Sequence, residues 1–182
     1  NMGPTYREFR HGPVVPAAGQ VVAVSVAAAD PDGVAAVTLW WSANGGGWNN
    51  STTSAGTGGV YTGTIPGQAA GTIVQFYVEG TDTLGASSTF PAAGSDSRAL
   101  LVVEDGRAML STLHNFRILM TTADADFMHD GNVLSNERLG ATVVYDERTV
   151  FYDVVVRLKG SAVGRGVPWV GFNLRFHPDQ LF

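Results

Sequence analysis

Apolar and polar residues alternate along several short segments in the first part of the chain, a pattern typical of β-strands with two different faces. In residues 72–81, Val74, Phe76 and Val78 fall on one face, and the residues between them are mostly polar. Similar alternation or short apolar runs predict further strands at residues 20–28, 34–42, 59–65 and 98–104. The first part of the chain is therefore predicted to be rich in β-structure.

Turn-forming residues separate these strands. Asp30-Pro31-Asp32-Gly33 combines a proline, which fixes φ, with a glycine that accepts positive φ. Asn44-Gly45-Gly46-Gly47 is typical of a β-hairpin. Six or seven strands at this spacing, with tryptophan on the second long strand, indicate an immunoglobulin-like or fibronectin-III-like β-sandwich. We assign the sandwich to residues 12–105 and treat residues 1–11 as an N-terminal extension.

The pattern changes after Asp105-Gly106-Arg107, which we take as a domain boundary. Thr121 is placed to cap a short helix over residues 123–128, with Asp124 reaching back to it. Strands are predicted at residues 115–121, 141–146, 150–159 and 171–176. Residues 106–182 would then form an α+β domain, and because the sequence closes on apolar residues we expect this domain to be truncated. The predicted fold class is mainly β.

Composition narrows the classes of function. The net charge is −5 and the 11 lysines and arginines form no run, which argues against a nucleic-acid-binding stripe. The chain has no cysteine, so disulfides, zinc thiolate sites and thiol catalysis are excluded. No apolar stretch approaches the roughly 20 residues that cross a bilayer, so we predict no membrane span.

The most distinctive motif is Arg157-Leu158-Lys159-Gly160-Ser161, which ends a predicted strand. Side chains two residues apart on a strand point to the same face, so Arg157 and Lys159 converge beside a glycine turn. Such a pair can hold phosphate oxygens through charge-assisted hydrogen bonds. The alternative is an ordinary surface strand, with both groups paired to carboxylates such as Asp153 or Asp146.

This motif resembles one in the CotH family, spore-coat-protein-H-type proteins that include atypical secretory kinases. The resemblance runs from about Leu113 to Phe182 and rests on the motif, on Phe151-Tyr152-Asp153 before it and on Phe172-Asn173-Leu174-Arg175-Phe176 after it. In the family a strand enters an R-L-[KR]-G-[NS] turn, and a strand of alternating aromatic and basic residues follows. An immunoglobulin-like module often precedes such domains.

The resemblance implies a partial kinase-like N-terminal lobe, with Arg157, Lys159, Gly160 and Ser161 near the phosphates of ATP. It also implies a bacterial protein that is secreted or held at the cell surface, acting on a protein substrate, with ATP and Mg²⁺ as cofactors of the full-length parent. The chain itself should need no cofactor. Val170-Gly171 stands where family members usually carry a lysine, which departs from the family's nucleotide contacts.

The acidic residues that hold metal in the family lie later in its sequence. Phosphoryl transfer depends on metal-held charge stabilisation, so we name no catalytic residue and no metal ligand here, and expect the fragment to be inactive. The leading hypothesis is thus part of an exported CotH-like kinase or pseudokinase with an accessory sandwich.

The main alternative is a non-enzymatic adhesion or carbohydrate-binding module with a cell-surface glycan as partner. Trp40 and Trp41 are adjacent on a strand, so one faces the core and the other the solvent. We assign Trp41, with Trp48 across the hairpin, to a candidate ligand surface; core packing is the competing interpretation.

Two acidic clusters offer weaker metal candidates. Asp30 and Asp32, with Asp82 or Asp96 as a further ligand, offer the oxygen atoms that Ca²⁺ prefers, but the spacing is not that of an EF-hand and we favour a plain turn. On a helix Asp126 and Asp130 share a face, with Asp124 and His129 nearby. Acidic residues in a first helical turn are expected from the helix dipole, so we favour a structural role.

Overall fold

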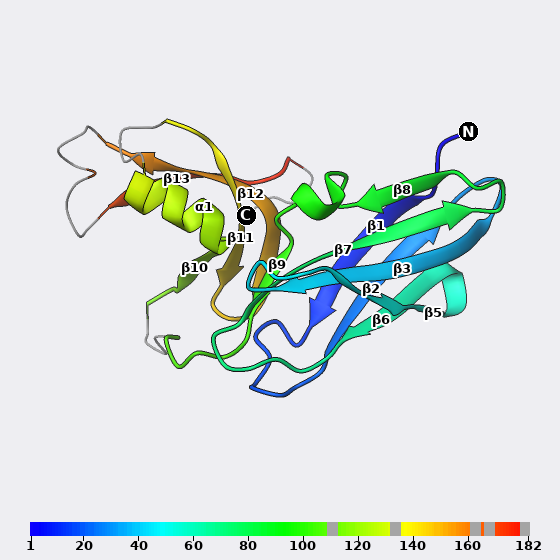
Figure 1. Cartoon of the computed structure of the whole chain (residues 1–182), viewed down its shortest axis with the longest axis horizontal. Helices are drawn as coiled ribbons and strands as arrows, with labels where there is room; N and C mark the ends of the chain where they lie inside the picture. Colours follow the sequence, from blue (N-terminus) through cyan, green and yellow to red (C-terminus); the bar gives the residue numbers. More distant parts are fainter. Residues whose placement is uncertain (109–112, 132–135, 161–164, 166–169, 179–182) are drawn as a thin grey trace.

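The computed structural model describes residues 1–108, 113–131, 136–160, 165 and 170–178. The fold is mainly β, as the alternation predicted. Two packed sheets form one part, and a third sheet with a short helix forms the other (Figure 1). Ser161 lies outside the described residues.

The first part is a sandwich of two antiparallel sheets (Figure 1). Sheet A has the order β1-β2-β6-β5 and sheet B the order β4-β3-β7-β8, with β9 paired to the other end of β7. The strands of sheet A are β1 (Thr5–Gly12), β2 (Val22–Ala29), β6 (Val60–Ile65) and β5 (Ser54–Ala55). Those of sheet B are β4 (Asn49–Thr52), β3 (Val34–Ala43), β7 (Ile73–Asp82), β8 (Ser87–Phe90) and β9 (Leu100–Val102). Two short 3₁₀ turns, η1 (Thr57–Gly59) and η2 (Gly94–Asp96), lie between strands.

The core of the sandwich is built by the inward positions of that alternation. Val24 and Val26 of β2 meet Leu39 of β3 and Phe76 of β7, and all four are at most 2% exposed. Burying side chains of this size contributes roughly 1.5–3 kcal/mol each. The period of two along each strand therefore fixes which face is buried.

The first residues of the chain belong to the sandwich and are not an extension, which corrects the assignment of residues 1–11. β1 pairs antiparallel with β2, from Thr5 opposite Ala29 to Gly12 opposite Ala23. Alternation did not reveal the strand because a β-bulge between Arg7 and Arg10 breaks the spacing of its core-side residues Tyr6, Phe9 and His11.

The second part is sheet C, an antiparallel sheet of order β10-β11-β12-β13. Its strands are β10 (Phe116–Leu119), β11 (Leu139–Tyr145), β12 (Thr149–Lys159) and β13 (Gly171–Arg175). The helix α1 (Thr122–Asp126) runs on into the π-turn η3 (Phe127–Gly131). The predicted cap is confirmed, because the Thr121 hydroxyl accepts a hydrogen bond from the Asp124 backbone N–H at 3.2 Å.

One face of sheet C is covered by the helical segment. Met120 and Met128 pack with Val156 and Leu158 of β12, all of them buried. The opposite face of the end of β12 carries polar side chains. Within the described residues no helix is long and apolar enough to cross a bilayer.

Sheet C packs directly against the sandwich. Leu100 and Val102 of β9 form one buried cluster with Leu119 and Val144 of sheet C. The Thr142 hydroxyl accepts a hydrogen bond from the Leu100 backbone N–H at 2.9 Å. The predicted boundary at Asp105-Gly106-Arg107 thus follows a strand, β9, that contacts both parts.

An aromatic cluster adds a second contact between the two parts. Tyr152 of β12 lies 5.3 Å from Phe9 and 5.9 Å from Phe76, measured between ring centroids. Its hydroxyl is 2.5 Å from Nδ1 of His11, whose Nε2 is 3.0 Å from the Val14 carbonyl oxygen. Because a carbonyl only accepts, Nε2 carries the proton, so Nδ1 accepts from the tyrosine.

Candidate functional site

The end of β12 carries the basic motif on one face and the core on the other. Val156 and Leu158 are buried, at 0% and 3% exposure, while Arg157 is half-buried and Lys159 exposed. The structure therefore brings Arg157 and Lys159 to one face, as their spacing predicts. Gly160 follows at φ +106°, a backbone conformation that side-chain-bearing residues rarely adopt.

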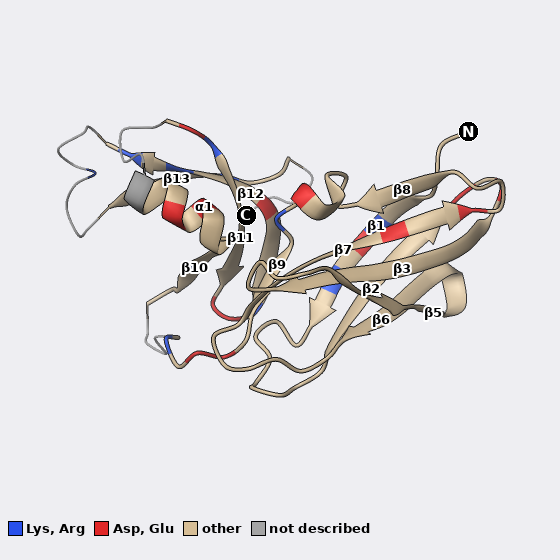
Figure 2. Cartoon of the chain, viewed as in Figure 1, with Lys and Arg blue, Asp and Glu red and all other residues tan. Residues whose placement is uncertain are grey.

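Two further arginines lie on this face, one on β13 and one just before β11. Arg157 lies opposite Asn173 in the register with β13, and Val155 lies opposite Arg175. A pocket of about 180 Å³ is lined by these four residues together with Arg138, which directly precedes β11. In Figure 2 several blue segments gather on sheet C. We call Arg138, Arg157, Lys159 and Arg175 the basic face.

The carboxylates expected to pair with Arg157 and Lys159 are engaged elsewhere. Asp153 accepts the Arg98 backbone N–H at 2.5 Å, and Asp146 accepts the Asn115 backbone N–H and His114 Nδ1, each at 2.8 Å. The Asn115 N–H, followed by His114, lowers the pKa of Asp146.

No residue of the basic face forms an ion pair or a side-chain hydrogen bond with any other residue that the structure describes. Among the described residues, Arg157 and Lys159 therefore have no carboxylate partner, and the alternative of an ordinary ion-paired surface strand does not hold there. A group of cations without carboxylates is an electrostatic setting that favours an anion.

The turn after Lys159 has features that the sequence did not reveal. A Cβ added at Gly171 would lie 3.6 Å from the Lys159 Cβ and 3.9 Å from its Cδ, so the lysine stem lies beside this glycine. Arg165, which is buried, donates from Nε to the Gly160 carbonyl at 3.0 Å and from Nη2 to Asn136 Oδ1 at 2.7 Å. These bonds attach the turn to a distant segment.

The tryptophans are arranged differently from the expected ligand surface. Trp41 packs against the sandwich core opposite Phe76, and its indole N–H is buried with no partner among the described residues. The outward residue is Trp40, whose Nε1 donates to Glu79 Oε2 at 2.9 Å. Trp41 therefore belongs to the core side, because β3 places Leu39 and Trp41 on the same face.

An aromatic face does exist on the outside of sheet B. Trp40 lies 6.3 Å from Tyr77 with ring planes 12° apart, and Trp48 meets Tyr77 edge-on at 5.0 Å and 71°. Trp48 is 36% exposed, while Trp40 and Tyr77 are half-buried. Burial, followed by the charge of Glu79, raises the pKa of Tyr77, so its hydroxyl stays protonated at neutral pH.

The acidic clusters have structural partners. Asp30, Asp32 and Asp82 bring carboxylate oxygens within 4.8 Å of one another. Asp82 accepts from the Leu84 and Ala86 backbone N–H groups at 2.9 and 2.8 Å, as in a folded turn. The cluster is thus accounted for by turn geometry.

The helical cluster is also explained by folding contacts. Asp124 accepts from Arg98 Nε at 2.5 Å and so joins α1 to the sandwich. Asp126 and His129 are exposed, and the side chain of Asp130 lies outside the described residues. Asp124 therefore has a structural role.

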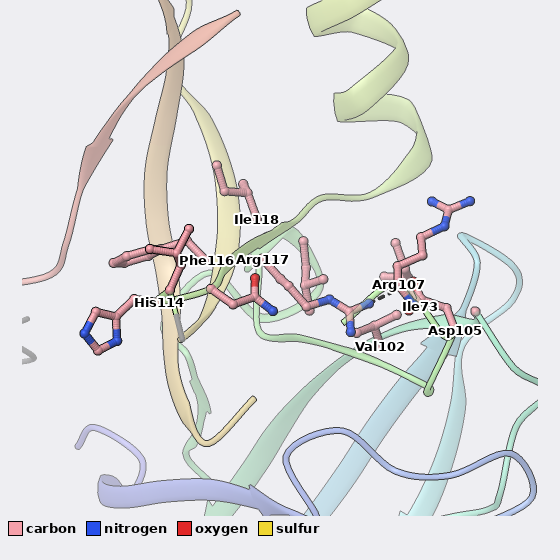
Figure 3. Close-up of a pocket in the computed structure, with 12 residues that line it drawn as sticks. Ile73, Val102, Asp105, Arg107, His114, Phe116, Arg117 and Ile118 are labelled. Carbon is pink, nitrogen blue, oxygen red and sulfur yellow. Dashed lines mark hydrogen bonds and ion pairs between the residues drawn. The ribbon is translucent and has the colours of Figure 1, made fainter. Parts of the chain in front are cut away.

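A larger pocket of about 590 Å³ lies between β10 and the Ile73–Val102 end of the sandwich (Figure 3). Arg117 reaches from β10 to Asp105 Oδ2 at 2.8 Å and to Glu147 Oε2 at 3.0 Å. Its charge is thus balanced by two carboxylates. Sequence reasoning did not single out this pocket, because its walls come from segments far apart in the chain.

No protein-family model matches the chain, and no curated protein matches it. Among solved structures, the Br derivative of BhCBM56 is 16% identical with a TM-score of 0.34, covering 49% of this chain and 91% of that one. The cycloalternan-forming enzyme from Listeria monocytogenes, in complex with a pentasaccharide, is 14% identical with a TM-score of 0.41. That match covers 85% of this chain, which spans 13% of the enzyme's length.

A third similar structure is an uncharacterised protein from Listeria monocytogenes EGD-e in complex with glucose, magnesium and calcium. It is 13% identical with a TM-score of 0.41, covering 82% of this chain and 13% of that one. At TM-scores below 0.5, these likenesses carry no conclusion about fold or function.

Proposed function

We propose that the basic face of sheet C holds the phosphates of a nucleotide, as the resemblance to the CotH family implies. In this proposal residues 106–182 correspond to part of a kinase-like N-terminal lobe, and the sandwich is an accessory module of an exported kinase or pseudokinase. The observation that carries the proposal is a set of four cations on one face of sheet C, Arg157 and Lys159 with Arg138 and Arg175, which have no ion pair with any described residue.

The strand order of the first part supports an immunoglobulin-like module. In that fold one sheet has strands A, B, E and D, and the other has C, F and G. The order β1-β2-β6-β5 corresponds to A-B-E-D, and β3-β7-β8 to C-F-G. Since this architecture serves many unrelated functions, it supports the domain arrangement but does not identify the activity, which has to be argued from the site.

The proposal is limited to binding. Transfer of a phosphoryl group requires carboxylates that hold Mg²⁺ and orient the acceptor hydroxyl. The described residues bring no carboxylate into an ion pair with the basic face. We therefore assign Arg157 and Lys159 to binding phosphate, and Gly160 to the turn that ends the strand beside them.

Calorimetric titration of the chain with Mg-ATP at low salt tests the proposal. We expect Arg157→Ala and Lys159→Ala each to lower the affinity about tenfold, since a hydrogen bond to a charged group is worth about 1.5–3 kcal/mol and exposure reduces it. Arg7→Ala is the matched control, because Arg7 is an exposed arginine on β1 of sheet A and does not line the basic pocket. Absence of Mg-ATP binding, or equal binding by all four proteins, would overturn the proposal.

A second candidate function is binding of a cell-surface glycan by the outer face of sheet B. The favouring observation is that Trp40, Tyr77 and Trp48 lie together there, beside the carboxylate of Glu79 and opposite the amide of Asn50. Aromatic rings can pack on the C–H faces of a sugar, while amides and carboxylates bind its hydroxyls.

Glycan-array screening decides this second candidate. Binding by the wild-type chain should be lost in Trp48→Ala and kept in Phe172→Ala, whose side chain is exposed to a similar degree on sheet C. No bound glycan, or equal loss in both variants, would count against it.

A further inference from the structure

We propose that Arg138, Arg157 and Arg175 form a single pocket for a phosphate or diphosphate group, with Asn173 as a neutral hydrogen-bond donor. The inference rests on the proposed function for the identity of the nucleotide, and it goes further by assigning Arg138 and Arg175. Neither arginine is part of the Arg157–Gly160 motif, so the motif alone does not reveal this pocket.

The register of sheet C brings the three arginines together. On β12, Val155 and Arg157 point to one face, and their direct partners on β13 are Arg175 and Asn173. Directly opposed residues of an antiparallel pair have Cβ atoms roughly 4.5–5.5 Å apart. Arg175 therefore stands diagonally beside Arg157 on the β13 side.

Arg138 completes the pocket from the other side of β12. The next residue, Leu139, pairs with Val156 on the buried face, so alternation places Arg138 on the face of Arg157. All three arginines line the same pocket of about 180 Å³. Arg157 thus lies on the central strand with one arginine on each flank.

Two other arginines near sheet C are balanced by carboxylates. Arg98 contacts Asp124 at 2.5 Å, and Arg117 contacts both Asp105 and Glu147. The pocket arginines have no such carboxylate among the described residues. Arginine keeps its charge at all ordinary pH values, so three neighbouring guanidinium groups repel one another until an anion lies between them.

The chemistry and size of the pocket favour phosphate. Guanidinium groups present paired N–H donors that match the oxygens of phosphate. One water molecule takes about 30 Å³ of liquid, so a pocket of about 180 Å³ has the space of about six. That space suits one or two phosphate groups, and a nucleoside would extend beyond it.

Titration with inorganic pyrophosphate, followed by calorimetry, tests the pocket without a nucleotide. We expect Arg138→Ala and Arg175→Ala each to weaken binding at least fivefold, and Arg175→Lys to weaken it less, because lysine keeps the charge and loses the paired donors. Arg7→Ala on β1 should bind like the wild type. Thermal unfolding of each variant verifies that it is folded.

The outcomes separate this inference from the proposed function. Pyrophosphate binding that depends on Arg138 and Arg175, without any binding of Mg-ATP, would support the pocket and overturn the nucleotide. Mg-ATP binding that is lost in Lys159→Ala but unchanged in Arg138→Ala and Arg175→Ala would overturn the pocket and support the nucleotide. Citrate binding as tightly as pyrophosphate would overturn the assignment to phosphate.

Discussion

The hydrogen bond between Tyr152 and His11 joins the two parts of the molecule, and its contribution to stability can be measured by removing the tyrosine hydroxyl. His11 is buried and Tyr152 is half-buried, and burial raises the pKa of Tyr152, which therefore stays a protonated donor. In Tyr152→Phe the ring contacts with Phe9 and Phe76 remain, while Nδ1 of His11 loses its donor inside the protein. Only the hydrogen bond is removed.

The expected cost follows from that unsatisfied nitrogen. Leaving a buried polar atom without a partner costs about 1–3 kcal/mol. For a chain of this size each kcal/mol lowers the Tm by about 2–4 °C, so we expect Tyr152→Phe to melt about 2–12 °C below the wild type. Chemical unfolding should show the same loss in the free energy of unfolding.

Tyr61→Phe is the matched control. Tyr61 is half-buried against the sandwich core, and its hydroxyl has no hydrogen bond among the described residues. Its removal should change the Tm by about 1 °C or less. If Tyr152→Phe is no more destabilising than Tyr61→Phe, the hydrogen bond to His11 does not stabilise the contact between the two parts.

Two further predictions concern the sandwich. Burial lowers the pKa of His11 below 6.5. Below about pH 6.5 the unfolded chain therefore binds more protons than the folded one, and the free energy of unfolding falls as the pH falls. Urea unfolding at about pH 7.5 and about pH 5.5 should show this decline, and His11→Gln should reduce it. A Cβ at Gly67 would overlap the backbone of Gly19, whose N–H donates to Gln68. Gly67→Ala should therefore destabilise the folded protein by about 2 kcal/mol or more in thermal unfolding. Gly47→Ala, with open space around the new atom, should be close to neutral. Equal stability of the two variants would contradict the reasoning.

Alternation predicted the parts of the fold in which one strand face is much more apolar than the other. The predicted common face of Val74, Phe76 and Val78 on β7 was confirmed, because burial of those side chains stabilises one register. β1 was missed because a β-bulge between Arg7 and Arg10 interrupts the period of two, so its core-side residues Tyr6, Phe9 and His11 do not alternate regularly.

The candidate site was predictable only within one strand. The spacing of Arg157 and Lys159 placed them on one face, but the register of sheet C is what brings Arg175 of β13, and Arg138 just before β11, beside them. The carboxylate of Asp153 accepts a hydrogen bond from the backbone N–H of Arg98, which is 55 residues away in the sequence, and no local pattern indicates this contact. For Trp40 and Trp41 alternation implied opposite faces, and the packing of Leu39 decided which one is buried.

Mapping of backbone amide shifts by NMR during titration with Mg-ATP tests the central claim most directly. The account predicts that shifts concentrate on residues 155–160 of β12 and its turn and on residues 171–175 of β13, and that Arg157→Ala with Lys159→Ala abolishes them. Shifts confined to the sandwich, or an unchanged pattern in the double variant, would contradict a phosphate site on the basic face.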